Sequence, residues 1–339
     1  MTTIYSPQQL RQRLDRLPRL QLAALPTPLM ELPRLSAAVG GPRIWIKRED
    51  LTGLAFGGNK IREFEYSIAP AVGAGCDVLV HGAAAQSNQS RTTAAVAARL
   101  GMKAVQVGRN DAHAQLQGNL LLSHLFGAEV LLPAAADQAA TLEATLDRLQ
   151  AAGHKPYNTS SDGAVYRGIA YVDGFLELWA QLQAKGVEPD VIYVASGAHT
   201  HTGMVVAARA LGLPLRVVGI SPSPRDNAAA AEHMTKLAAE HCRILDLNLD
   251  IRPEDLESYA EFVGPDYGVV TDGSREALQL AGRHEGLVLD PCYTGKAMAG
   301  LIAHVRDGWW TADDTVVFIH TGGTPALFAY ADELGIALQ

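Results

Sequence analysis

Residues 190–212 read DVIYVASGAHTHTGMVVAARALG, and this stretch decides the fold. It begins with a short apolar run, continues through a loop of small and polar residues, and ends in an Ala-rich run of helical length. The same order returns at residues 77–101, DVLVHGAAAQSNQSRTTAAVAARLG. Strands that alternate with helices predict an α/β fold with two doubly wound, mostly parallel sheets. Further runs typical of strands lie at 43–50, 102–108, 215–223 and 315–325.

In such sheets, ligands bind beyond the carboxyl ends of the strands. Three loops that follow predicted strands are rich in small and polar side chains, at residues 83–90, 196–202 and 321–324. We therefore expect a binding site where these loops meet.

The composition argues against two classes of partner. The chain has 339 residues, a formal net charge of −8 at pH 7, and 48% hydrophobic residues. Nucleic acids and anionic membranes require a basic surface, so neither is an expected partner. No apolar run has the length of a membrane span, and residues 1–17 lack the apolar core of a signal peptide. We expect a cytoplasmic protein that binds a small molecule.

The three cysteines, Cys76, Cys242 and Cys292, lie far apart and form no CxxC pair. This pattern favours neither a disulfide framework nor a cysteine-based zinc site, and it fits a reducing compartment. His199 and His201 stand two residues apart with no carboxylate close by, which is weak evidence for a metal. We expect no metal.

Residues 57–60, Gly-Gly-Asn-Lys, are the first candidate for chemistry. Two glycines allow the backbone to turn sharply and to approach a ligand closely. A lysine that serves as an amine nucleophile needs such a fixed and partly desolvated position. From the spacing alone, Lys60 is equally well read as a solvent-exposed lysine at the start of a helix.

Four more loops add to this candidate. The loop at 196–203 lies between a strand and a helix, where backbone N–H groups and hydroxyls make an anion cradle. The polar loop at 86–90 suits a carboxylate or a phenolic oxygen. Residues 290–296 open a helix, and residues 320–325 follow the last strand. A GxSxG elbow, a Walker loop and an HExxH motif are absent, so the signal lies in the order of these loops.

Together these segments resemble fold-type-II pyridoxal-phosphate enzymes, and most of all the group of 1-aminocyclopropane-1-carboxylate deaminase and D-cysteine desulfhydrase. The resemblance implies two α/β domains, residues 1–63 plus 173–339 and residues 64–172, with the cofactor between them, and a homodimer. The resemblance spans nearly the whole chain. The segments that carry it are KREDLTGLAFGGNKIREFEY (47–66), AAAQSNQSRTTAAVAARLGMK (83–103), GPDYGV (264–269), LDPCYTGKAMAGL (289–301) and FIHTGGTPALFAY (318–330).

The resemblance also implies roles for single residues. Lys60 would carry pyridoxal 5′-phosphate as a Schiff base and later move a proton at the substrate Cα. Ser87 and Gln89 would bind the substrate carboxylate, and Tyr267 and Tyr293 would assist catalysis. The remaining cofactor-binding residues would be Asn59, Asn88 at the phenolic oxygen, Gly197, Ala198, His199, Thr200, His201 and Thr202 around the phosphate, and Thr294 and Thr321 near the ring nitrogen.

The residue near the ring nitrogen distinguishes two branches of the family. The deaminases carry a glutamate after the tyrosine of this motif, whereas this chain has Thr294, as the desulfhydrases do. A carboxylate would keep the ring nitrogen protonated, whereas a hydroxyl from Thr294 or Thr321 can donate to an unprotonated nitrogen. The cofactor is then a weaker electron sink. This favours α,β-elimination over the opening of a cyclopropane ring. Gln89, however, resembles the deaminases, since desulfhydrases usually have histidine there.

Two departures from the family leave the substrate open. The relatives carry a second lysine near the phosphate, where this chain has Glu63. We expect Glu63 to point away, and Arg62, His199 or His201 to replace the lost charge. Where the relatives have a Gly-rich segment, this chain has polar residues followed by Tyr166 and Arg167. One hypothesis is that these two contact a polar substrate group, and the other is that Arg167 is solvated.

The leading interpretation is therefore a pyridoxal-phosphate-dependent lyase that converts a small β-substituted amino acid, such as D-cysteine, to a 2-oxo acid and ammonia. Ring-opening deamination and β-replacement synthesis are the enzymatic alternatives. A non-catalytic cofactor-binding protein is disfavoured by the complete set of lysine, carboxylate loop and tyrosines. A dinucleotide oxidoreductase is disfavoured because no loop has the GxGxxG pattern with an acidic residue downstream.

Overall fold

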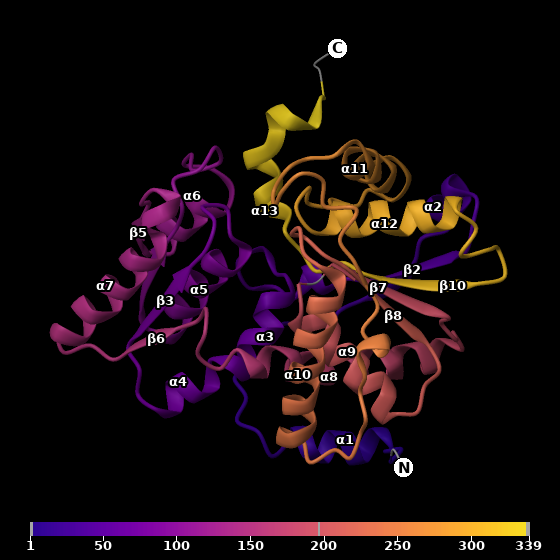
Figure 1. Cartoon of the computed structure of the whole chain (residues 1–339), viewed down its shortest axis with the longest axis horizontal. Helices are drawn as coiled ribbons and strands as arrows, with labels where there is room; N and C mark the ends of the chain where they lie inside the picture. Colours follow the sequence, from indigo (N-terminus) through magenta and orange to yellow (C-terminus); the bar gives the residue numbers. More distant parts are fainter. Residues whose placement is uncertain (1–2, 196, 337–339) are drawn as a thin grey trace.

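The structure is a computed structural model that describes residues 3–195 and 197–336. Its larger sheet has the strand order β1-β2-β10-β7-β8-β9, in which only β1 is antiparallel to its neighbour. Figure 1 shows this sheet between two layers of helices. The strands are β1 (Leu29–Glu31), β2 (Arg43–Lys47), β7 (Val191–Ala195), β8 (Arg216–Ile220), β9 (Ser258–Tyr259) and β10 (Thr315–Ile319).

The core of the larger sheet is built on both faces of β7. Ile192 and Val194 pack with helices on one face, whereas Val191, Tyr193 and Ala195 pack with helices on the other. A strand covered on both faces is apolar throughout, which explains the continuous run of the sequence. The first face is covered by α1 (Pro7–Leu14), α8 (Val165–Lys185), α9 (His199–Ala210) and α10 (Asn227–Ile244), and the second by α2 (Pro33–Val39), α11 (Asp272–Glu285) and α12 (Thr294–Arg306).

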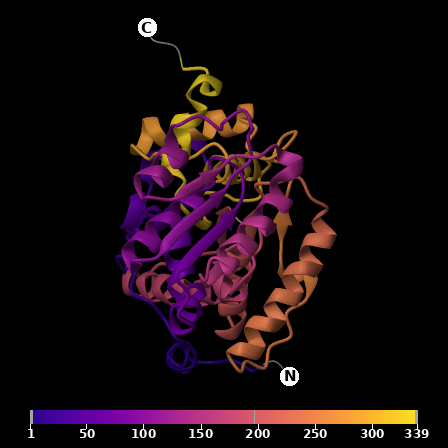
Figure 2. The ribbon, with the colours of Figure 1, turned by 90° about the vertical axis from the view of Figure 1, so that its left-hand side faces the viewer.

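The smaller sheet is wholly parallel and has the order β5-β4-β3-β6. In Figure 2 it faces the viewer. Its strands are β3 (Val78–Gly82), β4 (Lys103–Val107), β5 (Glu129–Leu131) and β6 (Pro156–Asn158). The helices around it are α3 (Asn59–Ser67), α4 (Ala69–Gly73), α5 (Asn88–Leu100), α6 (Gly118–Leu125) and α7 (Gln138–Ala151).

The remaining elements are short. They are α13 (Thr324–Leu327) and the 3₁₀ turns η1 (Glu49–Leu51), η2 (Leu54–Phe56), η3 (Ala135–Asp137), η4 (Pro253–Asp255) and η5 (Phe328–Leu334). No helix of the described residues is long and apolar enough to cross a membrane.

The predicted α/β class with mostly parallel sheets is confirmed. The domain limits 1–63 plus 173–339 and 64–172 stay a prediction, and the limit at 172 falls inside α8.

Helix α8 contacts the elements of both sheets. At its N-terminal end, the Arg167 guanidinium donates to the carbonyl of Thr159, just after β6. Farther along, Glu177 accepts from Lys47 of β2 and from Arg62 of α3. The helix also lies very close to α9, because a Cβ added at Gly203 would stand 2.0 Å from the carbonyl oxygen of residue 168. One uninterrupted helix thus connects the two sheets.

Candidate active site

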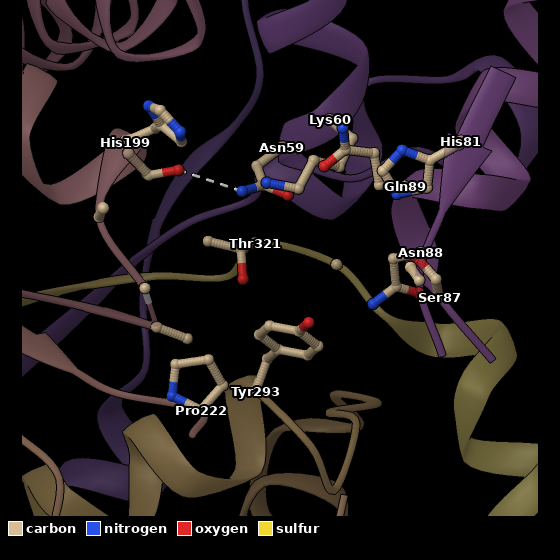
Figure 3. A pocket seen from close by; sticks show the side chains of 16 residues that line it. Asn59, Lys60, His81, Ser87, Asn88, Gln89, His199, Pro222, Tyr293 and Thr321 are labelled. Carbon is tan, nitrogen blue, oxygen red and sulfur yellow. Dashed lines mark hydrogen bonds between the residues drawn. The ribbon is translucent and has the colours of Figure 1, made fainter. Parts of the chain in front are cut away.

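A cavity of about 310 Å³ lies where the carboxyl ends of β3, β7, β8 and β10 converge, between the two sheets. Figure 3 shows its side chains entering from several separate segments. Most of the residues predicted for the site meet there. The lining residues are Asn59, Lys60, His81, Ala83, Ser87, Asn88, Gln89, Ala195, Gly197, Ala198, His199, Thr200, Pro222, Tyr293, Thr321 and Gly322.

The turn before Lys60 is fixed by backbone contacts. Gly57 has a φ of 63°, and a Cβ at this position would stand 2.0 Å from the carbonyl oxygen of Asp50. Only glycine fits such a position. The N–H of Asn59 donates to the Thr321 carbonyl at 2.9 Å, which ties the start of α3 to the loop after β10. Lys60 therefore enters the cavity from a rigid helix end.

Glu63 does not point away, so this expectation is wrong. It is fully buried, and its carboxylate accepts from the Lys60 Nζ at 2.9 and 3.0 Å. It also accepts from the Asn59 amide at 3.2 Å and from the Thr200 hydroxyl at 3.0 Å. One turn of α3 places residues 60 and 63 on the same side, so the contact follows from helix geometry.

The residues expected to replace the positive charge of the relatives' second lysine do not do so. Arg62 points to the opposite side of α3 and pairs with Glu49 and Glu177. Burial lowers the pKa of His199 to about 3 and that of His201 to about 4, so both rings are neutral near pH 7.

A buried ion network holds α3 in place behind the cavity. The Arg62 guanidinium donates to Glu49 of η1 at 2.7 and 2.9 Å and to Glu177 of α8 at 3.1 and 3.2 Å. Lys47 donates to Glu177 at 2.5 Å. Burial alone would raise the pKa of Glu49, but the charge and hydrogen bonds of Arg62 lower it to about 2. The network thus connects the Lys60 helix to both β2 and α8.

The start of α9 forms an anion cradle at one end of the cavity. The N-cap residue is Ala198, whose side chain cannot accept a hydrogen bond, so no side chain of the described residues caps this helix. The N–H groups at the start of a helix point outward, and together with the helix dipole they favour an anion there. The Thr202 hydroxyl is buried and has no hydrogen-bond partner among the described residues. Ser196 lies outside the described residues.

The start of α5 forms a second polar wall. Ser87 is its N-cap and accepts from the N–H of Ser90 at 3.2 Å. The carbonyl oxygen of the Asn88 side chain accepts from Asn119 at 2.8 Å. The Gln89 amide donates to the Thr159 carbonyl at 2.9 Å. These contacts orient all three side chains that line the cavity from this loop.

Tyr293, just before α12, enters the cavity on the side away from Lys60 (Figure 3). Its hydroxyl lies 3.1 Å from that of Tyr267, which lines the adjoining outer cavity. Burial raises the pKa of both phenols. Tyr293 raises the pKa of Tyr267 further, whereas the hydrogen bond from Tyr267 lowers that of Tyr293 by less than burial raises it, so both stay protonated near neutral pH. Asp290 orients this region, since its carboxylate accepts from the backbone N–H groups of residues 292, 293 and 294.

The two threonines predicted near the ring nitrogen lie in different surroundings. The Thr294 hydroxyl is buried and donates to the Asp290 carboxylate at 2.7 Å, and Thr294 does not line the cavity. Thr321 lines the cavity. Of the two, Thr321 is therefore the residue whose hydroxyl can meet a ligand.

Tyr166 and Arg167 do not line the cavity. Tyr166 packs against the core of the larger sheet, and Arg167 donates to the Thr159 carbonyl from a buried position. Their contact with substrate stays a prediction.

Sequence reasoning missed His81, which lines the cavity at the end of β3. Its Nδ1 lies 3.0 Å from the Thr159 hydroxyl and 3.2 Å from the Ser160 hydroxyl. Burial lowers its pKa to about 3, so the ring is neutral. A polar residue at the carboxyl end of an apolar strand was the available signal.

No group of three or more His, Cys, Asp or Glu side chains within residues 3–195 and 197–336 could hold a metal ion. The fold and the cavity instead define an α/β protein with a lysine amine at one side of a cavity and an anion cradle at the other. The model of the family described as "Pyridoxal-phosphate dependent enzyme" matches residues 20–322, and the chain belongs to this family.

The chain is similar to named relatives over nearly all of its length. It is 38% identical over 324 residues to D-cysteine desulfhydrases of Salmonella schwarzengrund (strain CVM19633) and Salmonella typhi, which covers 94% of this chain and 97% of each relative. A solved structure titled as that of an ACC deaminase homologue is 32% identical with a TM-score of 0.85, covering 96% of this chain and 98% of that chain. These findings confirm the predicted family, fold class and cofactor.

The cavity offers a counterpart for each end of pyridoxal phosphate. The cofactor carries an aldehyde, which a lysine amine can bind covalently, and Lys60 lines the cavity. It also carries a phosphate, for which the start of α9 and the buried Thr202 hydroxyl are suited, since no described side chain caps the helix or binds this hydroxyl. The residues present thus fit the group.

Proposed function

We propose that this enzyme is a lyase that performs α,β-elimination on a small amino acid with a leaving group at Cβ, and releases a 2-oxo acid and ammonia. The single observation that carries the proposal is the cavity itself. It brings together Lys60, the polar wall of α5, Tyr293 and the start of α9 from segments far apart in the chain.

When bound, pyridoxal phosphate supplies an electron-withdrawing ring that stabilises negative charge at the substrate Cα. Lys60 would hold its aldehyde carbon, and the loop of residues 197–202 its phosphate. Asn88 would hold its phenolic oxygen. The Thr321 hydroxyl would donate to its ring nitrogen, because the Thr294 hydroxyl already donates to Asp290. A hydroxyl in place of a carboxylate there supports elimination of a good leaving group.

The chain's own side chains would bind the substrate and move its protons. Ser87 and Gln89, at the start of α5, would bind the substrate carboxylate with help from the helix dipole. The Lys60 amine would take the proton from Cα, since a positioned amine acts as a general base. Tyr293 stays protonated and so would donate a proton. Tyr267 would orient it through the contact between their hydroxyls.

The relatives named D-cysteine desulfhydrase make D-cysteine the first substrate to test. A panel of D- and L-amino acids with different groups at Cβ, scored for 2-oxo acid release, identifies the substrate. The wild-type enzyme should show a visible absorption band that borohydride abolishes and that Lys60→Ala lacks. A protein that cannot be loaded with pyridoxal phosphate would contradict the proposal.

The ring-opening deamination of 1-aminocyclopropane-1-carboxylate is a second candidate. It is favoured by the likeness to a solved ACC deaminase homologue and by Gln89 in the carboxylate loop. Release of 2-oxobutanoate from that substrate, measured beside pyruvate release from D-cysteine, decides between the two.

We further propose a cytoplasmic homodimer. The apolar side chains of Leu116, Leu121 and Leu125, in and before α6, are exposed and support a contact with a second copy. Light scattering on the purified enzyme tests the mass, and cell fractionation tests the location.

A further inference from the structure

Glu63 joins the cofactor-bearing lysine to the phosphate cradle. One of its oxygens accepts from three donors, namely the Asn59 amide at 3.2 Å, the Lys60 amine at 3.0 Å and the Thr200 hydroxyl at 3.0 Å. The other oxygen accepts from Lys60 at 2.9 Å. The side chain is fully buried, so water does not screen its charge. A buried carboxylate thus lies directly at the second residue of α9.

Two cations face Glu63, and Lys60 is the one that contacts it directly. Lys60 faces it from its own helix, and Arg167 of α8 is close enough that the Glu63 charge raises the pKa of its guanidinium, against the larger lowering by burial. His199 of α9 is neutral because burial lowers its pKa to about 3. Burial raises the pKa of Tyr171 and of Tyr293, and the charge of Glu63 raises both further. Both phenols are therefore neutral.

Binding of the cofactor upsets this balance. Lys60 must leave Glu63 in order to bind the aldehyde, and a phosphate at the start of α9 would compete with Glu63 for the Thr200 hydroxyl. A carboxylate and a phosphate would then share a buried region, with Arg167 as the remaining cation that faces Glu63. Two like charges in such a place disfavour each other, and the uptake of a proton relieves the repulsion.

We propose that Glu63 makes the binding of a phosphate-bearing cofactor weaker and links it to the uptake of a proton. The proposal rests on the proposed function, which assigns the phosphate to residues 197–202. The Glu63 carboxylate repels the phosphate group and not the ring or the aldehyde. Removing the charge at position 63 therefore strengthens binding of pyridoxal phosphate more than binding of pyridoxal, which has the same ring and aldehyde but no phosphate.

The test compares dissociation constants in the full-length protein after removal of its cofactor. Pyridoxal phosphate and pyridoxal are titrated into the wild type and into Glu63→Gln, with the change in visible absorbance as the readout. We expect Glu63→Gln to bind pyridoxal phosphate at least about tenfold more tightly, as expected for a like charge removed from a buried site. Its affinity for pyridoxal should change by much less.

The same titrations across the neutral pH range test the proton. The affinity of the wild type for pyridoxal phosphate should fall more steeply with rising pH than that of Glu63→Gln. Titrations inherent to the cofactor occur in both proteins, so the difference between the two slopes reports Glu63. Equal slopes would contradict the linked uptake.

Glu65→Gln is the matched control. It removes a buried carboxylate from the same helix, but one that binds Arg19 and the N–H groups of residues 22 and 23. It should leave the ratio of the two affinities unchanged. Thermal unfolding checks that each variant folds, and Glu63→Lys is the second variant if Glu63→Gln does not.

Each result decides one question. If the variants at position 63 bind pyridoxal phosphate no more tightly than the wild type, or gain as much for pyridoxal, the inference is overturned. If the wild type and Lys60→Ala bind pyridoxal phosphate alike, the proposed function fails instead.

Discussion

At the scale of single residues, one side of the cavity holds two neighbouring phenols. Tyr293 lines the cavity and Tyr267 supports it from the outer side, at 3.1 Å between the hydroxyls. Because burial raises the pKa of both above the ordinary value, each phenol keeps its proton near pH 7. The two tyrosines are therefore expected to contribute unequally.

Replacing Tyr293 with phenylalanine should lower kcat by about 10²-fold or more, as expected when a positioned proton donor is lost. The absorption band of the bound cofactor should be unchanged. Tyr267→Phe, which removes only the supporting contact, should have an effect of about tenfold or less on kcat. Steady-state kinetics on the best substrate measure both variants. Equal losses in the two variants would show that Tyr293 is not the donor.

At the scale of elements, the glycine turn before α3 determines where Lys60 lies. Gly57 has a positive φ and a neighbour that excludes any side chain. Gly57→Ala should displace the start of α3 and abolish the visible cofactor band. Gly286→Ala is the control, because this residue has a φ of 64° but nothing within 4 Å of an added Cβ. It should cost only about 1–2 kcal/mol of stability and keep the band. Denaturant unfolding and absorbance check both.

The ion network behind α3 gives a prediction about pH. The pKa of Glu49 is about 2 in the folded protein against an ordinary value of 4.5. A lowered pKa contributes stability that is fully present above the ordinary value and is lost as the pH falls towards about 2. Glu49→Gln should destabilise the protein by about 3–5 kcal/mol at pH 7, since it leaves Arg62 partly unpaired. Denaturant unfolding at several pH values should show the gap closing in acid.

The exposed pair of Glu276 and Arg306, with both side chains about half exposed, is the comparison for that network. Glu276→Gln should change stability by about 1 kcal/mol or less. If the two glutamate variants lost equal stability, the buried network would have no special role in fixing α3.

Whether a feature of the site can be predicted from the sequence depends on how far apart along the chain the residues in contact lie. Lys60 and residues of the loops after β3, β7 and β10 line one cavity, and each of these segments can be recognised from a local strand-loop-helix pattern. The contact of Glu63 with Thr200 joins residues 137 positions apart and depends on how α3 and α9 are each placed against α8. No local pattern reports such a contact.

Thr294 shows a limit of a different kind. Its hydroxyl binds Asp290, four positions earlier, which is the kind of contact that residues at a helix start often make. The resemblance to the family directed attention to the ring nitrogen instead. For Arg167, the polar residues before it suggest a solvated side chain as one alternative, but the residue lies buried in α8.

At the scale of the whole molecule, the cofactor would contact both sheets and thus should stabilise the entire fold. A ligand that binds only the native state at about 100 times its Kd adds about 2.7 kcal/mol to the free energy of unfolding. Saturating pyridoxal phosphate should therefore raise the Tm of the wild type. Lys60→Ala should show a much smaller rise. Differential scanning calorimetry measures both, and an equal rise in the two proteins would place the cofactor elsewhere.

Helix α8 has a consequence for which changes in length the chain tolerates. Arg167 near one end binds the segment after β6, and Glu177 farther on binds β2 and α3. One inserted residue between them would turn the rest of the helix by about 100° and advance it by about 1.5 Å. Either end could keep its partners, but not both. Insertions and deletions in functional descendants of this sequence should therefore gather in the surface loops, and the interval from 167 to 177 should keep its length.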